Sequence, residues 1–214
     1  MDEVFKKKKI IAKLQNLPGV DTKKFKNIKL KEIRKIKKKF DLPINKKIIL
    51  HVGHLKVERN ISFFKKIQKN PKYHVVIVGS TITEQDTKLI NDLQNSGCTL
   101  ITKYLKNIEE IYQVSDLYIF PVLNEREAIQ MPLSILEALS ASVPVLSTNF
   151  GSINEFLGSK KNNISYFNKH EMNFPFKKIN SIINSKSVNK KNYLEFDWKN
   201  IVFSLNKIYA KSLF

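Results

Sequence analysis

Short apolar runs alternate with segments of helical period from about residue 46 onward. The runs have the length of buried strands and cover residues 47–52, 74–78, 98–101, 117–120, 143–147 and 163–167. Apolar residues at helical spacing lie between them, at 61–67, 83–93, 108–114, 132–139 and 152–157. Short strands that alternate with helices are typical of right-handed βαβ units. The pattern therefore predicts an α/β fold, with a Rossmann-like parallel sheet of about six strands and helices on both faces.

The two ends of the chain differ from this central pattern. Apolar residues at positions 30, 33, 36 and 40 would form one stripe on a lysine-rich helix, which could pack on the sheet edge or contact a membrane surface or partner. Residues 198–213 follow the helical period and predict a helix with a broad apolar face. We therefore expect a basic N-terminal arm and helix at 1–40, a Rossmann-like domain at 41–195 and an amphipathic helix at 196–214.

The composition favours a globular protein of the cytoplasm. The chain has 214 residues, of which 42% are hydrophobic, enough for a real core. No apolar run approaches the roughly 18 residues that span a bilayer, and the first twenty residues do not resemble a signal peptide. Cys98 is the single cysteine, which excludes an internal disulfide and a cysteine metal cluster. Its apolar surroundings predict a buried, inert thiol.

The net charge of +19 lies mainly at the two ends of the chain. Residues 1–39 carry +11 and residues 159–214 carry +8, whereas residues 101–158 carry −4. Lysine supplies most of the excess, and arginine, which suits bidentate contacts to bases, occurs three times. A solvated surface is the simplest interpretation, and peripheral attraction to an anionic inner membrane face is the next. We expect no specific nucleic-acid partner.

Two glycines at strand ends mark a candidate anion site. Gly53 follows the first apolar run and allows a tight turn, and Arg59 comes shortly before a predicted helix. Backbone N–H groups and a fixed cation are what a phosphate needs. Gly79 ends the second run, where it would allow a ligand or a loop to approach closely. Carboxyl ends of parallel strands form the crevice in which open α/β sheets bind nucleotides.

The stretch 116–157 reads as strand, loop, helix, strand, glycine turn and helix, with Glu137 early in the first of these helices. It resembles the donor-binding segment of the retaining, nucleotide-sugar-dependent glycosyltransferases of GT-B fold, the large "glycosyl transferases group 1" family. Relatives carry two glutamates eight positions apart, and Glu137 matches the second. Ile129 occupies the position of the first. Glu127 is the nearer replacement for it, and Glu125 is the other candidate.

The resemblance extends along most of the chain. Residues 17–25 resemble the segment that joins the two GT-B domains, and residues 196–201 resemble the closing helix of the family. The family has Arg where this chain has His54, which would be a weaker phosphate ligand, cationic only if its pKa is raised, and which could equally be a capping or core histidine. Arg59 stands at the place of a lysine that grips the donor diphosphate. Sixteen residues precede Leu17, too few for an acceptor-binding domain. The chain thus resembles the C-terminal, donor-binding half of such an enzyme.

The resemblance also implies roles for individual residues. It assigns Arg59 to the departing phosphates and Glu127 to the transferred sugar as the catalytic groups. The residues that it implies for donor binding are Gly53, His54, Arg59, Gly79, Tyr104, Leu105, Ser134 and Glu137. The implied donor is a UDP- or GDP-linked hexose, with no further cofactor and no metal.

These features lead to one functional hypothesis and two alternatives. The hypothesis is a glycosyltransferase donor-binding domain that acts in retaining transfer, needs a separate acceptor-binding partner and could have little transferase activity by itself. The first alternative is a non-catalytic or truncated nucleotide-sugar-binding module. The second is a charge-driven binder of lipid or nucleic acid, whose affinity would fall steeply with salt.

Overall fold

The structure is a computed structural model that describes residues 18–80, 86–157, 163–168, 170–171, 176–185 and 190–212. One six-stranded sheet lies at its centre, in the order β3-β2-β1-β4-β5-β6, and all of its neighbouring strands run parallel. The strands are β1 (Lys47–Gly53), β2 (Tyr73–Gly79), β3 (Thr99–Ile101), β4 (Leu117–Phe120), β5 (Val145–Ser147) and β6 (Ile164–Tyr166). This confirms the predicted α/β class, and each strand falls on one of the predicted apolar runs.

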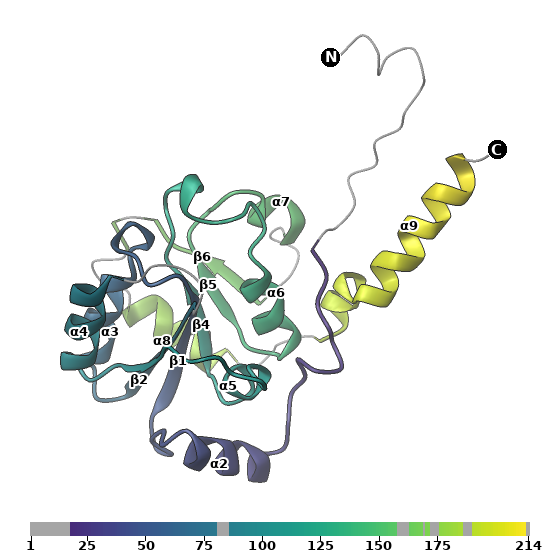
Figure 1. The fold of residues 1–214 in the computed structure, drawn as a ribbon. Helices are drawn as coiled ribbons and strands as arrows, with labels where there is room; N and C mark the ends of the chain where they lie inside the picture. The colour runs from purple at the N-terminus through teal and green to yellow at the C-terminus, as the bar shows by residue number, and fades with distance from the viewer. Residues whose placement is uncertain are drawn as a thin grey trace.

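Helices cover both faces of the sheet (Figure 1). The α-helices are α2 (Leu30–Lys39), α3 (Phe64–Gln68), α4 (Thr87–Asn95), α5 (Glu109–Gln113), α6 (Leu133–Ser140), α7 (Ile153–Leu157), α8 (Phe176–Asn184) and α9 (Trp198–Ser212). The 3-10 helices are η1 (Val57–Arg59), η2 (Ile61–Phe63), η3 (Glu125–Glu127) and η5 (Lys190–Phe196). None of the described helices is long and apolar enough to cross a membrane.

Two hydrophobic cores form because alternate residues of each strand face opposite sides of the sheet. Ile48 and Leu50 belong to the core beneath α5, α6 and α7, whereas Ile49 belongs to the core beneath α3, α4 and α8. All three of these side chains are fully buried. The continuous apolar runs of the sequence reflect this burial on both faces, as is usual in parallel sheets.

Three local features differ from the sequence-based expectation. The helix predicted at 61–67 starts as 3-10 turns, because Asn60 adopts a left-handed conformation with φ of 58° and interrupts the first turn. Helix α4 begins after Asp86, whose side chain accepts a 3.0 Å hydrogen bond from the Leu89 N–H. Thr83, at which the helix predicted over 83–93 would begin, lies outside the described residues. Helix α8 and the η5 segment have no counterpart among the predicted helices.

The N-terminal linker lies beside the start of the last helix. Val20 donates its backbone N–H to Phe196 at 2.8 Å and accepts from Trp198 N–H at 3.3 Å. A Cβ at Gly19 would lie 2.6 Å from the Trp198 ring, so glycine permits this close approach. Beyond this contact α9 stands away from the sheet in Figure 1. The predicted apolar face of α9 is buried at Ile201, whereas Trp198, Val202, Phe203 and Tyr209 are exposed.

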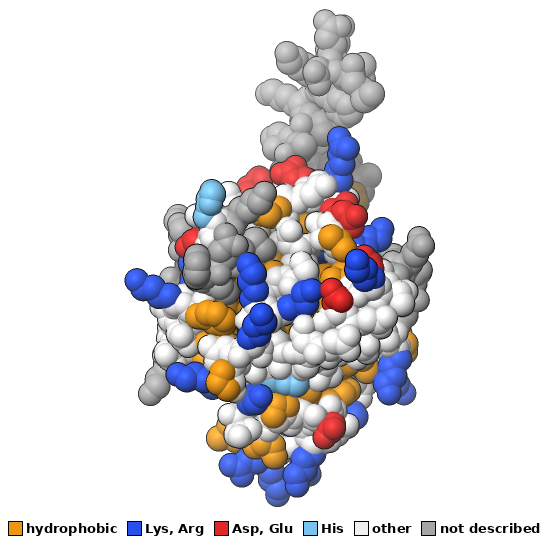
Figure 2. Space-filling view, turned by 90° about the vertical axis from the view of Figure 1, so that its left-hand side faces the viewer, with side chains coloured by type: hydrophobic (Ala, Val, Ile, Leu, Met, Phe, Trp, Pro, Cys, Tyr) orange, Lys and Arg blue, Asp and Glu red, His pale blue; other side chains and the backbone are white. Residues whose placement is uncertain are grey.

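Helix α2 carries a basic surface at one end of the molecule. Ile33, Ile36 and Phe40 pack on the core, as one interpretation of the apolar stripe expects, but Leu30 is exposed. In Figure 2 many Lys and Arg side chains lie on the visible face, and several gather at its lower end, the level at which α2 lies in Figure 1.

Candidate functional site

The strand order places a crevice beside β1, which pairs with β2 on one side and with β4 on the other. Chain connections run in opposite directions from this point of the sheet, and open α/β sheets bind ligands there, outside the carboxyl ends of the strands. A groove of about 450 Å³ lies at these ends. It is lined by Lys24, Val52, Gly53, His54, Val78, Gly79, Ser80, Lys103, Tyr104, Leu105, Lys106 and Ile108. Such a volume suits a small-molecule ligand.

The two glycines predicted from the sequence lie side by side in this groove. Gly53 and Gly79 are register partners at the ends of β1 and β2. A Cβ at Gly79 would lie 2.6 Å from Leu55 Cδ1, and a Cβ at Gly53 would lie 3.1 Å from His51 Nε2 and 3.3 Å from Arg59 Cζ. Glycine at both positions therefore leaves room for the side chains beneath and exposes backbone to a ligand.

The groove is electropositive. Lys24, Lys103 and Lys106 line it, and no Asp or Glu does so in the part of the chain that the structure describes. Lys24 also pairs with Glu109 at 3.3 Å. His54 adds a ring but no charge, because burial together with nearby Arg59 and Lys56 lowers its pKa. The sequence-based prediction of His54 as a cationic phosphate ligand required a raised pKa. In this structure the pKa is lowered, so the His54 ring lines the groove in its neutral form.

Arg59 lies below the groove at the end of η1. It is 5% exposed, its guanidinium lies 5.8 Å from the centre of the Phe120 ring, and its Nε has no hydrogen-bond partner. Burial lowers the pKa of Arg59, and the charge of Glu127 acts in the opposite direction. The same carboxylate opposes the lowering of the His54 pKa. The structure thus brings Glu127 of η3 into electrostatic range of both basic groups.

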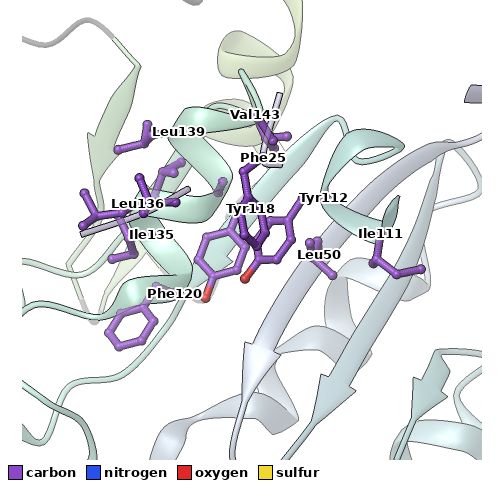
Figure 3. Close-up of a cluster of buried hydrophobic side chains, with 14 of the residues drawn as sticks. Phe25, Leu50, Ile111, Tyr112, Tyr118, Phe120, Ile135, Leu136, Leu139 and Val143 are labelled. Carbon is purple, nitrogen blue, oxygen red and sulfur yellow. The ribbon is translucent and has the colours of Figure 1, made fainter. Parts of the chain in front are cut away.

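Glu137 and Ser134 lie on α6, behind the groove, and two buried tyrosines hold them. The Tyr112 hydroxyl donates to Glu137 Oε2 at 2.6 Å, and the Tyr118 hydroxyl donates to Ser134 Oγ at 2.7 Å. The two rings lie side by side, with centroids 6.0 Å apart, and their hydroxyls point the same way (Figure 3). Burial raises the pKa of Glu137, while the Tyr112 hydrogen bond and the charge of Lys24 oppose that rise.

The predicted residues therefore fall into three groups. Five of them line the groove, namely Gly53, His54, Gly79, Tyr104 and Leu105. Arg59 lies beneath it, and Glu127, Ser134 and Glu137 are not among its lining residues. Tyr104 is 80% exposed, so its ring is free to contact a ligand. Asp116, just before β4, has a structural role, because its carboxylate accepts the Ile48 N–H at 2.9 Å.

Sequence reasoning missed the three lysines of the groove and both tyrosines. Lys103 and Lys106 flank the predicted Tyr104 and Leu105, so their position along the chain was an available signal. Lys24 had no such signal, since the fold brings it to the groove from the N-terminal linker. No group of three or more His, Cys, Asp or Glu side chains that could hold a metal ion occurs within the described residues.

Comparison with known proteins finds relatives in sequence and in fold. The chain is 26% identical over 132 residues to the putative teichuronic acid biosynthesis glycosyltransferase TuaC of Bacillus subtilis (strain 168), a stretch that covers 58% of this chain and 30% of TuaC. It superposes on Anabaena Alr3699/HepE, solved in complex with UDP, with a TM-score of 0.74 at 16% identity, covering 90% of this chain and 56% of that one. The latter likeness concerns the fold.

The solved C-terminal domain of a glycosyl transferase group 1 family protein, LpcC of Francisella tularensis, is also similar in fold. Its TM-score is 0.58 at 15% identity, and the match covers 86% of this chain and 97% of that domain. The chain thus spans less than two thirds of TuaC and of HepE but nearly all of an isolated C-terminal domain. Residues 32–195 match the family described as Glycosyl transferases group 1. The chain therefore belongs to the glycosyl transferases group 1 family.

Proposed function

We propose that this chain binds the nucleoside diphosphate sugar donor of a retaining glycosyl transfer reaction. The observation that carries the proposal is the electropositive groove at the carboxyl ends of β1, β2 and β3, with Gly53 and Gly79 side by side. Backbone amides and fixed cations are the groups that hold a diphosphate. A fold match to HepE, whose structure contains UDP, supports the same class of ligand.

The proposal gives each part of the site a task. In this proposal Lys103 and Lys106, which line the groove, and Arg59, which lies next to Gly53, bind the diphosphate, and Tyr104 and Leu105 contact the nucleoside base. Glu137 accepts from a ribose hydroxyl through Oε1, because Tyr112 already occupies Oε2. Glu127, near Arg59 and His54, contacts the transferred sugar.

Catalysis in this proposal is electrostatic and positional. The C–O bond between the sugar and the diphosphate breaks, and the cations stabilise the negative charge that builds up on the leaving phosphate. The acceptor hydroxyl attacks from the face that the diphosphate leaves, which retains the anomeric configuration. Acceptor-binding groups come from a partner outside these 214 residues, which is supported by the 56% coverage of the HepE chain.

The experiment is calorimetric titration of the chain with UDP, GDP, UDP-glucose and GDP-mannose at moderate salt. We expect saturable binding of one nucleotide, lost in Glu137→Gln and strongly weakened, but still measurable at high ligand concentration, in Arg59→Ala. Matched controls are Glu155→Gln and Arg34→Ala, at exposed positions of α7 and α2, which should bind as the unchanged chain does. An affinity that falls steeply with salt concentration and that is the same in the Glu137→Gln variant would instead show a charge-driven binder.

Retention and the need for a partner have their own test. We expect donor-dependent transfer only when an acceptor-binding partner is added, with the product's anomeric configuration, read by NMR, equal to that of the donor. Donor binding without transfer under any such condition would favour a non-catalytic nucleotide-sugar-binding module. Inversion of the configuration would contradict the retaining mode while leaving donor binding in place.

We further propose a cytoplasmic location with peripheral contact to an anionic membrane. Helix α2 supports this, since its Lys31, Arg34, Lys35 and Lys38 are exposed. Co-sedimentation with phosphatidylserine vesicles, and not with phosphatidylcholine vesicles, is the expected result. Replacing these four residues by Gln should abolish it without changing nucleotide affinity.

A further inference from the structure

A buried histidine lies directly beneath the candidate phosphate site. His51 of β1 is 0% exposed, and its ring packs near two others, Phe64, with centroids 5.3 Å apart, and Tyr118, with centroids 6.3 Å apart. This packing holds the ring in place. Sequence reasoning read this position only as part of an apolar strand.

The hydrogen bonding of His51 determines which ring nitrogen carries the proton. Nδ1 lies 2.9 Å from the Ile119 carbonyl oxygen, which only accepts, so Nδ1 is the donor. Burial lowers the pKa of His51 to about 3, so the ring is neutral near pH 7. Nε2 is therefore a bare lone pair. It is buried and has no hydrogen-bond partner.

Nε2 of His51 and the Arg59 guanidinium both lie close to the position that a Cβ of Gly53 would take. A Cβ at Gly53 would lie 3.1 Å from His51 Nε2 and 3.3 Å from both Cζ and Nη2 of Arg59. Arg59 is itself 5% exposed, and its Nε also lacks a partner. A buried acceptor and a buried donor group thus both border the space that the missing side chain of Gly53 leaves open. Each unmatched group costs free energy while it stays unpaired.

We propose that His51 is a positioning residue for Arg59, and that its Nε2 accepts a guanidinium N–H when a diphosphate occupies the groove. The inference rests on the proposed function. A guanidinium has five N–H donors in a fixed fork, and a phosphate takes only those directed toward the groove. His51 Nε2 accepts a guanidinium N–H that is directed away from the groove, and this hydrogen bond fixes the plane of the guanidinium. Gly53 keeps the path between the two side chains clear.

A double-mutant cycle tests the coupling. His51→Phe keeps a ring in the same pocket but lacks the acceptor, and UDP and inorganic diphosphate are the probes. We expect His51→Phe to weaken the binding of both roughly 10-fold or more, the size typical of a hydrogen bond to a charged group. In an Arg59→Ala background the same change should have little further effect. His51→Gln, which can place an amide oxygen near the position of Nε2, should recover part of the affinity.

The outcomes separate this inference from the proposed function. Unchanged affinity in His51→Phe, or equal losses in both backgrounds, overturns the positioning role while donor binding stands. Binding of diphosphate but of no nucleotide, with the His51 coupling present, overturns the proposed function alone. An unchanged chain that binds neither probe overturns both.

A measurement on the unchanged chain covers the case in which His51→Phe fails to fold. Nitrogen-15 NMR of the imidazoles should show an unprotonated Nε2 at His51 whose resonance moves when inorganic diphosphate is added. The Arg59→Ala chain should show no such movement. An Nε2 resonance that stays unchanged at saturating diphosphate contradicts the inference.

Discussion

Tyr112 donates its hydroxyl hydrogen to Glu137 Oε2 across 2.6 Å, and the tyrosine is fully buried. Burial raises the pKa of Glu137, and this hydrogen bond is the largest effect that opposes the rise. The bond therefore favours the ionised form of a buried carboxyl and leaves Oε1 for another donor. It also joins α5 to α6 behind the groove, so the proposed ribose contact depends on the core.

Tyr112→Phe should leave Glu137 without that donor and raise its pKa further. A carboxyl whose pKa is raised in the folded state makes the protein less stable as pH rises above its unfolded pKa. The variant should thus lose about 1–3 kcal/mol of unfolding free energy near pH 7 and less near pH 4, where the carboxyl is protonated in both chains. Urea unfolding at the two pH values measures this. Tyr209→Phe, on the exposed part of α9, is the control and should change nothing.

His51 should make the chain acid-sensitive. Burial lowers its pKa to about 3, from about 6.5 in the unfolded chain. As the pH falls below about 6.5, the unfolded state therefore binds a proton while the folded state stays neutral at this histidine. The contribution of the neutral His51 to the free energy of unfolding is therefore fully present above about pH 6.5 and is lost toward pH 3. The loss reaches about 3 kcal/mol at pH 4. Unfolding of the unchanged chain and of His51→Phe across this range isolates the contribution of this histidine. Parallel pH profiles for the two chains would contradict the prediction.

Gly151 is required by its backbone conformation and by its surroundings. Its φ is 49°, and a Cβ there would lie 2.5 Å from the backbone oxygen of Gln130. Gly97 also has a positive φ, of 87°, but a Cβ there would meet only the Gln68 side chain, at 3.4 Å. Gly97→Ala should cost about 1–2 kcal/mol through the backbone alone. Gly151→Ala should cost about 1–3 kcal/mol more, because the carbonyl must move.

Thermal and urea unfolding of both alanine variants measure this difference. Equal losses would show that the Gln130 loop adapts without cost. A greater loss in Gly97→Ala would contradict the steric argument.

Cys98 should be unreactive in the folded protein. Burial raises the pKa of its thiol to about 12, and 6% of the residue is exposed. Thiolate is the reactive form, so an aromatic disulfide reagent at pH 8 should modify the native chain only as fast as it opens. The urea-unfolded chain should react at once. Rapid reaction of the native chain would show that β3 opens readily at the sheet edge.

The sequence alone determined the sheet, its class and the position of its glycines. Parallel strands covered on both faces must be continuously apolar, so each run was visible without any partner strand. Gly53 and Gly79 end such runs, which predicted that they meet at one edge. Glu137 was identified through the resemblance to the family, because it matches the second of the two glutamates that relatives carry.

The tertiary structure alone decided which side chains meet. Lys24 of the N-terminal linker lines the groove, and Tyr112 of α5 donates a hydrogen bond to Glu137 of α6. His51 Nε2 and the Arg59 guanidinium both lie within 3.3 Å of the position that a Cβ of Gly53 would take. Local periodicity indicates that a residue is buried, but it does not indicate which residues pack against it. That depends on strand register and helix packing, which bring together residues far apart in the chain. In the sequence His51 is one more member of an apolar strand, because Arg59, its proposed partner, belongs to the separate turn η1.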